Sequence, residues 1–375
     1  MFSVSGGWGR PEGKKAMEPT RKKPDRFQEH PAYIAWTGFA GCTEAIRGID
    51  VLKEDDRSSV YRLVTADPRG PNIIVKSSSR DRIVKESTAY ERILPLARVV
   101  VPRYRGFVDG REHENSYLFV DEVGGRDYSS AIGEHRLIAG EWLGRFHVSS
   151  AELIAKARYF ERDLQYYQGH LRLAAETILK HRSNPSLKED DLQVLDAITS
   201  QCDLMERHWG ELEDYCSRMP LCYSHGDFKS DNVRIVHTSS GHRHLVVFDW
   251  SAIALHIPAV DATQLFARSF SKEPINADIH AYCAIVRRKW PFMDVPQVRR
   301  LAYVGEIFRW VVAIRWAAED LKYEWTEQAI YLFRLYRSWM EDIVHVAPWE
   351  KTCVARDRLG RIAASSIGVG SRAPR

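Results

Sequence analysis

The residues best suited to chemistry lie in one short stretch and in the apolar segment that follows it. The stretch His225–Asn232 reads HGDFKSDN, and residues 246–250 read VVFDW. Asp227 is a carboxylate that can accept a proton from a hydroxyl, and Asn232 and Asp249 carry oxygen ligands of the kind that hold Mg²⁺ against nucleotide phosphates. Each residue alone is common, whereas the whole order is uncommon. The pattern therefore predicts phosphoryl transfer from a nucleotide to a hydroxyl.

A β-hairpin is expected to position these side chains. Residues 233–236 and 245–248 read as two strands, and residues 238–241 form a turn signal between them. A hairpin brings its two ends together, so Asn232 and Asp249 are expected to lie close enough to share a divalent cation. The alternative is an ordinary hairpin with turn-forming Asp and Asn at its ends, which leaves the rest of the pattern unexplained.

A lysine and a glutamate ahead of the loop are expected to act on the nucleotide. Lys76 ends a predicted strand at 73–76, and a predicted helix at 82–94, ended by Pro95, follows it. In kinases a lysine in this place contacts the α- and β-phosphates and pairs with a helix glutamate. Glu86 is the expected partner of Lys76, and Glu91 is the alternative.

The loop that should cover the phosphates is unusual. Residues 53–59, between two predicted strands, contain no glycine. Glycine would let backbone N–H groups approach phosphates closely. Ser58 and Ser59 are therefore expected to contact phosphate through hydroxyl or amide groups, whereas the acidic residues 54–56 would repel it if they pointed inward.

These motifs resemble the aminoglycoside phosphotransferase and choline kinase family, the small-molecule branch of the protein-kinase-like fold. The resemblance covers about residues 45–265. It implies an α+β fold of two lobes, with a strand-rich N-lobe and a mostly helical C-lobe. It also implies ATP or GTP as the phosphate donor and Mg²⁺ as the cofactor.

The resemblance also implies roles for individual residues. Asp227 would be the base, and Lys229 would neutralise charge on the transferred group, unless it is only a solvated loop lysine. Backbone groups of Asp121 and Val123 would contact the purine. Three further residues are expected to be structural: His225 as an anchor of the loop, Asp261 as its brace, and His147.

The pattern along the chain divides it into four parts. Residues 1–30 are predicted to be a disordered basic tail, 31–123 the nucleotide-binding N-lobe, 124–353 the C-lobe with the acceptor site, and 354–375 a flexible tail. Strands are predicted at 58–65, 72–76, 99–101 and 117–120. Helices are predicted at 136–147, 151–180, 187–218, 259–271, 277–290, 295–319 and 325–345.

Composition narrows the class of protein. The 375 residues are 44% hydrophobic and 28% charged, as in an ordinary globular protein. A formal net charge of +4 suits nucleotide binding and is too small to indicate binding to nucleic acid. The six cysteines form no CxxC pair, and no apolar run approaches the ~20 residues that span a membrane. A cytoplasmic protein without a membrane segment is expected.

The acceptor is expected to be a small molecule. Protein kinases place a long peptide-docking segment after the metal-binding aspartate, whereas here a helix is predicted soon after Asp249. The first hypothesis is an antibiotic or another natural product. The alternatives are a choline, homoserine or sugar kinase and a nucleotide-binding pseudokinase. Aromatic side chains of the late helices either line the acceptor site or belong to the core: Phe308, Trp310, Trp316, Tyr323 and Trp325.

Overall fold

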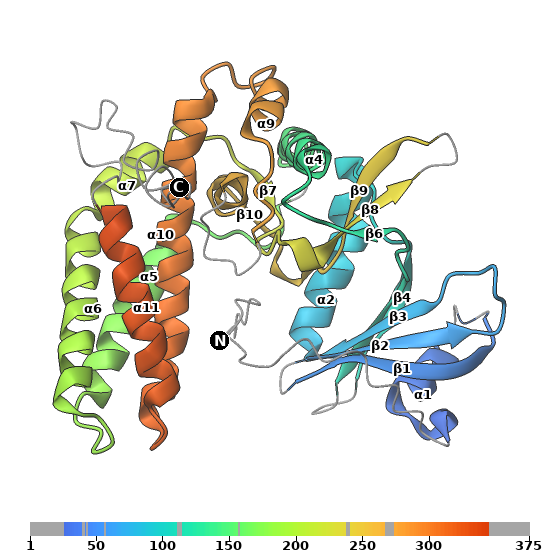
Figure 1. The fold of residues 1–375 in the computed structure, drawn as a ribbon, viewed down its shortest axis with the longest axis horizontal. Coiled ribbons are helices and arrows are strands. Elements are labelled where there is room, and N and C mark those ends of the chain that lie inside the picture. The colour runs from blue at the N-terminus through green and yellow to red at the C-terminus, as the bar shows by residue number, and fades with distance from the viewer. Residues whose placement is uncertain are drawn as a thin grey trace, which may run out of the picture.

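A five-stranded sheet and a helical body form the two lobes of an α+β fold (Figure 1). This confirms the predicted fold class. The computed structural model describes residues 26–39, 42, 44–55, 58–110, 115–156, 158–237, 241–266 and 274–344.

The predicted tails lie almost wholly outside the described residues. The exception is residues 26–30, which are ordered. Phe27–Glu29 forms a 3₁₀ turn, and the Nδ1 atom of His30 accepts a hydrogen bond of 3.2 Å from the backbone N–H of Ala32. This contact caps helix α1 (Pro31–Gly38). The N-lobe therefore begins earlier than the composition of the tail indicated.

The N-lobe sheet is antiparallel throughout. Its strands, in spatial order, are β1 (Ile46–Glu54), β2 (Ser58–Thr65), β3 (Ile73–Ser78), β5 (Ser116–Asp121) and β4 (Tyr104–Val108). The strand predicted at 99–101 is wrong. Pro102 has no N–H to donate to a ladder, and pairing with β5 begins only at Tyr104, which is opposite Val120.

The two faces of this sheet contact different helices. One face packs against α1, with the ring of Trp36 5.2 Å from that of Phe119. The opposite face carries Lys76 and meets helix α2 (Arg80–Thr88), which lies between the sheet and the C-lobe. The alternation along β2 and β3 thus places a charged side chain at the boundary between the lobes.

Helix α2 does not end at Pro95 as predicted. It continues through a π-helical turn (Ala89–Ile93) into the short helix α3 (Leu94–Ala97). Pro95 lies in the first turn of α3. Proline is tolerated there because the first N–H groups of a helix have no acceptor within that helix.

The C-lobe is mostly helical. Its helices are α4 (Gly133–Ala151), α5 (Leu164–His181), α6 (Glu189–Arg207), α7 (Trp209–Cys216), α8 (Ala259–Ala262), α9 (Ile279–Val286), α10 (Val295–Glu319) and α11 (Glu327–Val344). Two small sheets accompany them, one of β7 (Cys222–Ser224) and β10 (Ala254–His256), the other of β6 (Arg126–Asp127), β8 (Val233–His237) and β9 (Arg243–Val247).

Several predicted helices are correct in kind but differ in length. The bounds of α10 agree with the prediction, whereas α5 begins only at Leu164, after its N-cap Asp163 accepts a hydrogen bond from the backbone N–H of Tyr166. Helix α8 ends at Ala262, and residues 267–273 lie outside the described ranges.

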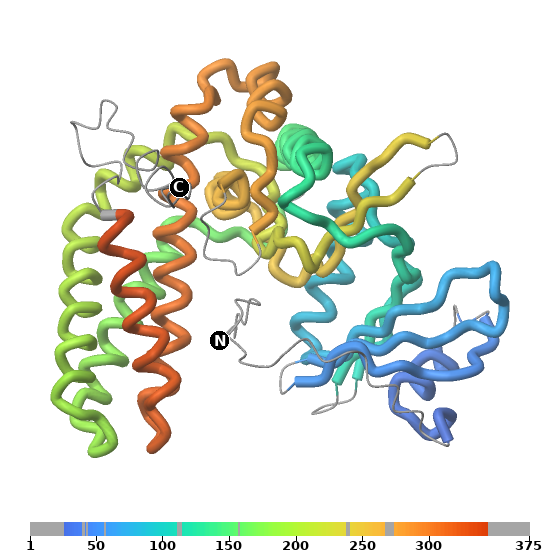
Figure 2. Tube along the Cα trace, in the orientation of Figure 1, coloured from blue at the N-terminus to red at the C-terminus, as the bar shows by residue number. Residues whose placement is uncertain are grey.

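Helices α5, α6, α10 and α11 run side by side as a bundle at one end of the molecule (Figure 2). Helix α10 is its centre, and both Phe308 and Trp310 are buried in the core. Tyr323 and Trp325 lie beyond the end of α10, stack at 4.4 Å and are exposed. Within the described ranges, no helix has the length and apolar character needed to cross a membrane.

Candidate active site

The loop from His225 to Asn232 turns sharply after β7. Gly226 has a φ of +79°, and a Cβ at this position would lie 2.5 Å from the carbonyl oxygen of Ala252. Only glycine combines this backbone conformation with so close an approach. The loop is therefore pressed against the segment that follows Asp249.

A buried carboxylate holds the backbone of this loop. Asp261, on α8, accepts hydrogen bonds from the backbone N–H groups of His225 (2.7 Å) and Gly226 (2.9 Å). The Nε2 atom of His147 lies 3.3 Å from the same carboxylate. Although burial opposes the charge, hydrogen bonding and the charge of His147 lower the pKa of Asp261. His225 joins the two halves of the site, because its Nε2 atom lies 3.1 Å from the carbonyl oxygen of Phe248.

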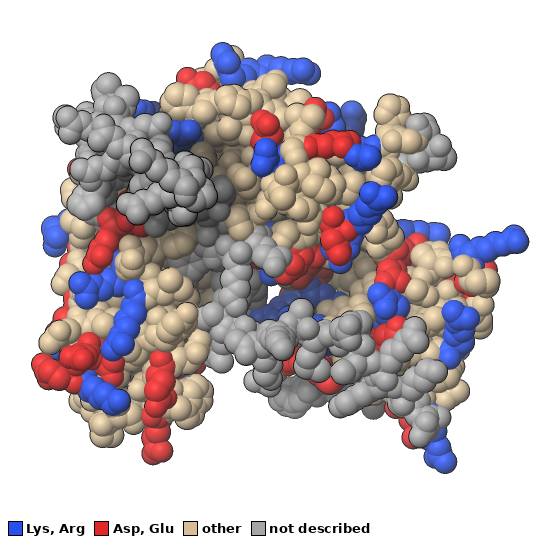
Figure 3. All heavy atoms as spheres, in the orientation of Figure 1, with Lys and Arg blue, Asp and Glu red and all other residues tan. Residues whose placement is uncertain are grey.

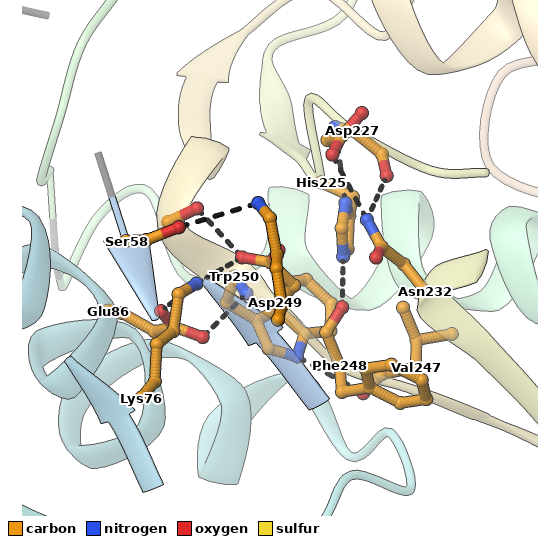
Figure 4. A network of polar contacts seen from close by, with 12 residues as sticks. Ser58, Lys76, Glu86, His225, Asp227, Asn232, Val247, Phe248, Asp249 and Trp250 are labelled. Atoms are coloured by element: carbon orange, nitrogen blue, oxygen red, sulfur yellow. Dashed lines mark hydrogen bonds and ion pairs between the residues drawn. The ribbon is translucent and has the colours of Figure 1, made fainter. Parts of the chain in front are cut away.

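The loop brings the expected base and its neighbours together (Figure 4). The Nδ2 atom of Asn232 donates to the backbone oxygen of Asp227 (2.9 Å) and to its carboxylate (3.1 Å). The Nζ atom of Lys229 lies 3.1 Å from the same carboxylate. Burial raises the pKa of Asp227, with Lys229 opposing the rise and the charge of Asp249 adding to it.

Asp249 occupies the opposite side of the site in a left-handed conformation, with a φ of +61°. Its carboxylate accepts hydrogen bonds from the ammonium group of Lys76 and from the hydroxyl of Ser251, the latter at 2.8 Å. Burial opposes ionisation, but Lys76 and Ser251 together hold the pKa of Asp249 far below its usual range. The pKa of Asp249 is thus lowered and that of Asp227 is raised, although both carboxylates belong to the same site.

Lys76 also pairs with the glutamate of α2. Its Nζ atom lies 2.7 Å from the Oε2 atom of Glu86, and the backbone N–H of Trp250 donates to the other oxygen of Glu86 at 3.1 Å. Glu91 instead accepts hydrogen bonds from Ser87 and Tyr104. The geometry therefore favours Glu86 of the two candidates, and it links α2, β3 and the segment after β9.

The two serines of the expected phosphate loop face opposite sides of the sheet. Ser58 is opposite Ser78 in the β2–β3 ladder and shares the face of Lys76. Ser59 lies on the other face, where its side chain bonds to Tyr61. The prediction for the Ser59 hydroxyl is therefore wrong, because the pleat alternates side chains between faces.

The acidic charge of this loop is partly neutralised by the loop itself. Asp55 accepts a hydrogen bond of 2.9 Å from the backbone N–H of Ser58, and its carboxylate lies 2.8 Å from the Nζ atom of Lys53. The amide of Ser58 is thus already used, and its hydroxyl accepts a hydrogen bond of 3.4 Å from the Nζ atom of Lys53. Asp56 and Arg57 lie outside the described residues.

The residues expected to contact the purine differ in whether their backbone N–H groups already have an acceptor. The backbone N–H of Asp121 donates to Arg103 at 2.9 Å, and that of Glu122 donates to Asn72 at 2.8 Å. The Asp121 carboxylate pairs with Arg105 at 2.5 Å. No internal acceptor for the Val123 amide is found in the described part of the chain, so Val123 is better placed than Asp121 to offer an N–H to a base.

The residues fit a divalent cation that is completed by nucleotide phosphates. No cluster of three or more His, Cys, Asp or Glu side chains in the described residues could hold a metal by itself. Asn232 uses its Nδ2 atom on Asp227, which leaves its Oδ1 atom, together with the Asp249 carboxylate, as the candidate oxygen ligands. Such a sparse oxygen set is typical of Mg²⁺ held with substrate phosphates.

Two further side chains of the site were not identified from the sequence. Ser251 bonds to Asp249, and a serine two residues beyond the aspartate was a signal that could have been read. Arg309, on α10, is buried, donates to the hydroxyl of Thr263 at 2.9 Å, and its charge interacts with that of Asp227. Nothing in the apolar sequence around Arg309 indicated this position.

Comparison with known structures shows that several phosphotransferases share this fold. A spectinomycin phosphotransferase solved with ADP and spectinomycin aligns with a TM-score of 0.54 and 11% identity, over 80% of this chain and 94% of that one. An aminoglycoside 2″-phosphotransferase solved with GDP and kanamycin aligns with a TM-score of 0.54 and 15% identity, over 80% and 94%. A choline kinase from Cryptosporidium parvum aligns with a TM-score of 0.49 and 14% identity, over 81% and 91%.

Sequence comparison gives the family. No curated protein matches the chain significantly. The model of the phosphotransferase enzyme family matches residues 51–296, which include the catalytic loop, Lys76 and Asp249. The chain therefore belongs to the phosphotransferase enzyme family and is a small-molecule kinase, an enzyme that transfers phosphate to an alcohol.

Proposed function

We propose that the enzyme transfers the γ-phosphate of ATP or GTP, with Mg²⁺, to a hydroxyl of an antibiotic or another natural product. The observation that carries the proposal is the convergence of Asp227, Asn232 and Asp249 beside the Lys76–Glu86 pair. A proton acceptor, oxygen ligands and a phosphate-binding cation then meet in one cleft, as phosphoryl transfer requires.

Asp227 orients the acceptor hydroxyl and takes its proton. Its carboxylate is fixed by Asn232 and Lys229 on one side, so a hydroxyl that approaches from the cleft meets a preset oxygen. The raised pKa makes the ionised Asp227 carboxylate a better proton acceptor than that of an exposed aspartate.

Lys76 and Lys229 stabilise negative charge on the nucleotide. Lys76 is held by Glu86 and contacts Asp249, so a triphosphate that enters the cleft finds an ammonium group already in place. Asn232 and Asp249 would hold Mg²⁺, which when bound neutralises the β- and γ-phosphate oxygens. Lys229 lies beside the base, where a cation stabilises charge on the transferred group.

The size of the acceptor follows from the segment after Asp249. This segment passes directly into β10 and α8 and is packed into the C-lobe, with Ala252, Ile253 and Ala259 buried. It supports no extended platform for a polypeptide, which favours a small acceptor. The spectinomycin and kanamycin complexes of the similar structures also favour a hydroxylated small molecule as the class of acceptor.

A transfer assay tests the proposal. The protein is incubated with Mg-ATP or Mg-GTP and a panel of hydroxylated natural products, and the mass gain of one phosphate is recorded. We expect transfer by the wild type and a loss of about 10²–10⁴-fold in kcat for Asp227→Asn. Nucleotide binding without transfer or hydrolysis, across the panel, would contradict the proposal and indicate a nucleotide-binding scaffold.

A further inference from the structure

Three basic side chains of different elements lie near one another beside the active site. They are Lys85 of α2, Arg162 of the segment before α5, and Arg315 of α10, and we name them the basic cluster. Figure 3 shows basic side chains inside the hollow between the helical bundle and the N-lobe. The cluster has a role in none of the contacts described above.

Arg162 is the centre of the cluster. The whole residue is only 8% exposed, yet it forms no ion pair with a carboxylate in the described part of the chain. Its guanidinium group lies 5.4 Å from the ring of Tyr166, and its side chain bonds to Tyr167. A buried cation without a counter-ion is costly and is characteristic of binding sites rather than of structural cores.

The backbone places Arg162 close to the catalytic loop. The N–H of Arg162 donates to Leu255 at 3.0 Å, and the N–H of Leu255 donates to Phe160 at 3.1 Å, so this segment lies along β10. On its other side β10 pairs with β7, which leads into the loop that carries Asp227. Two strand spacings, about 10 Å, therefore separate the Arg162 backbone from that of β7.

Lys85 reaches the cluster from the N-lobe. Its Nζ atom lies 5.2 Å from the ring of Phe160, a residue held at a φ of +56°. Such a conformation is rare for a bulky residue and is kept where the surroundings impose it. Burial and the charge of Arg162 lower the pKa of Lys85 to about 6, with Glu86 opposing the shift.

Arg315 closes the cluster from the bundle. Its Nη2 atom lies 2.9 Å from Glu319, but its Nε and Nη1 atoms are buried and have no hydrogen-bond partner among the described residues. Burial and the charges of Arg315 and Arg162 lower the pKa of His170 to about 4. His256, on β10, likewise has its pKa lowered to about 3 by burial and Arg162. Histidines therefore stay neutral beside an excess of positive charge.

An aromatic contact connects the cluster with the base. Tyr167, which bonds to Arg162, stacks on Phe308 with ring centroids 4.0 Å apart. The next residue, Arg309, interacts electrostatically with Asp227. Packed side chains of α5 and α10 thus connect the cluster with the base, and the buried Glu306 on α10 offsets the charge of Arg309.

We propose that the basic cluster binds a carboxylate or phosphate group of the acceptor, so that this enzyme phosphorylates an anionic hydroxylated small molecule. The inference rests on the proposed function and narrows its acceptor class. Buried guanidinium groups bind such oxyanions through paired N–H donors. They would also offset the repulsion between an anionic acceptor and the nucleotide phosphates. A polycationic acceptor would instead be repelled.

A binding measurement tests this without requiring turnover. The protein is saturated with Mg-ADP and titrated with glycerate, glycerol 3-phosphate, glyceramide, glycerol and kanamycin, and calorimetry gives each Kd. We expect the acid or the phosphate ester to bind at least about tenfold more tightly than glycerol and glyceramide, and kanamycin to bind no better than glycerol. Which of the two anions binds more tightly identifies the group. Equal binding of all five, or preferred binding of kanamycin, overturns the inference.

Variants locate the binding group. Arg315→Gln and Lys85→Met should each weaken binding of the preferred anion by about tenfold and leave glycerol unchanged, while Lys85→Arg should retain it. Arg182→Gln, at the far end of α5, is the matched control because Arg182 pairs with exposed Asp196. Unchanged anion binding in Arg315→Gln and Lys85→Met overturns the inference. Mg-ATP hydrolysis, measured in the same samples, reports separately on the proposed function.

Discussion

At the scale of single residues, the site separates the roles of two carboxylates by their surroundings. Asp227 is buried beside Asn232 and Lys229, and its pKa is raised, whereas Lys76 and Ser251 hold the pKa of Asp249 low. A proton acceptor benefits from a raised pKa, whereas a cation ligand needs a low pKa that keeps it ionised. The difference arises because Lys76 and Ser251 outweigh burial at Asp249, while burial outweighs Lys229 at Asp227.

The raised pKa of Asp227 predicts the acid limb of the pH profile. Only the ionised carboxylate accepts a proton, so kcat/KM should fall about tenfold per pH unit below the raised pKa, which lies above the ordinary value of 3.8. Initial rates between pH 4 and pH 8 measure the limb. A rate that stays constant down to pH 4 would contradict the prediction.

The same shift has a consequence for stability. The folded protein binds the proton of Asp227 more tightly than the unfolded chain does. The free energy of unfolding therefore falls as the pH rises from the ordinary pKa of 3.8 through the raised pKa of the folded state. Below the ordinary pKa the carboxyl is protonated in both states and the effect vanishes. Asp227→Asn, which cannot ionise, is therefore expected to have a Tm at pH 7 no lower than that of the wild type, which separates its loss of activity from a loss of fold.

At the scale of elements, close packing of α10 on α8 holds the brace of the catalytic loop. A Cβ on Gly305 would lie 1.9 Å from the carbonyl oxygen of Ala259, two residues before Asp261. The backbones of these helices are in direct contact, so Gly305 fixes the depth at which Asp261 sits. The helical bundle thus influences the position of the loop through the contact between α10 and α8.

Gly305→Ala should both destabilise the protein and misplace Asp261. We expect a loss of about 1–3 kcal/mol in the free energy of unfolding, because the new methyl group meets backbone, together with a lower kcat. Gly169→Ala is the matched control, since a Cβ there meets nothing within 4 Å; it should add about 0.8–1 kcal/mol through helix propensity. Denaturant unfolding and rate measurements check both. A stable, active Gly305→Ala variant would contradict the packing argument.

At the scale of the whole molecule, ion pairs and ring contacts join the two lobes across the cleft. Lys76 of the N-lobe contacts Asp249 of the C-lobe, and Lys85 lies over Phe160. The backbone N–H of Trp250 donates to Glu86 across the same boundary. Nucleotide and acceptor would thus bind between two lobes whose relative position is already fixed by these contacts.

Nucleotide binding should therefore stabilise the whole protein through Lys76. Mg-ADP at about 100 times its Kd adds roughly 2.7 kcal/mol to the free energy of unfolding, which raises Tm in a thermal scan. Lys76→Met is expected to lose most of this increase, because it removes the cation that faces the phosphates. Lys180→Met, on the exposed end of α5, should keep it. An equal increase in both variants would contradict the role of Lys76.

The sequence by itself determined the family and the two-lobed fold, and it predicted which residues form the candidate site. The catalytic hairpin was predictable because its spacing is local: Asn232 and Asp249 lie at the two ends of one hairpin, and chain connectivity brings them together. Helix α10 was predictable for a similar reason, since it carries its own N-cap at Asp294 and a proline in its first turn.

Only the tertiary structure decided which partners these residues have. The choice of Glu86 over Glu91 and the face of the sheet on which Ser59 lies depend on contacts between elements. The basic cluster is the clearest case, because Lys85, Arg162 and Arg315 are far apart in the chain. The charge of Arg162 lowers the pKa of Lys85 only after folding has removed the water between them, and burial is a property that no single segment possesses.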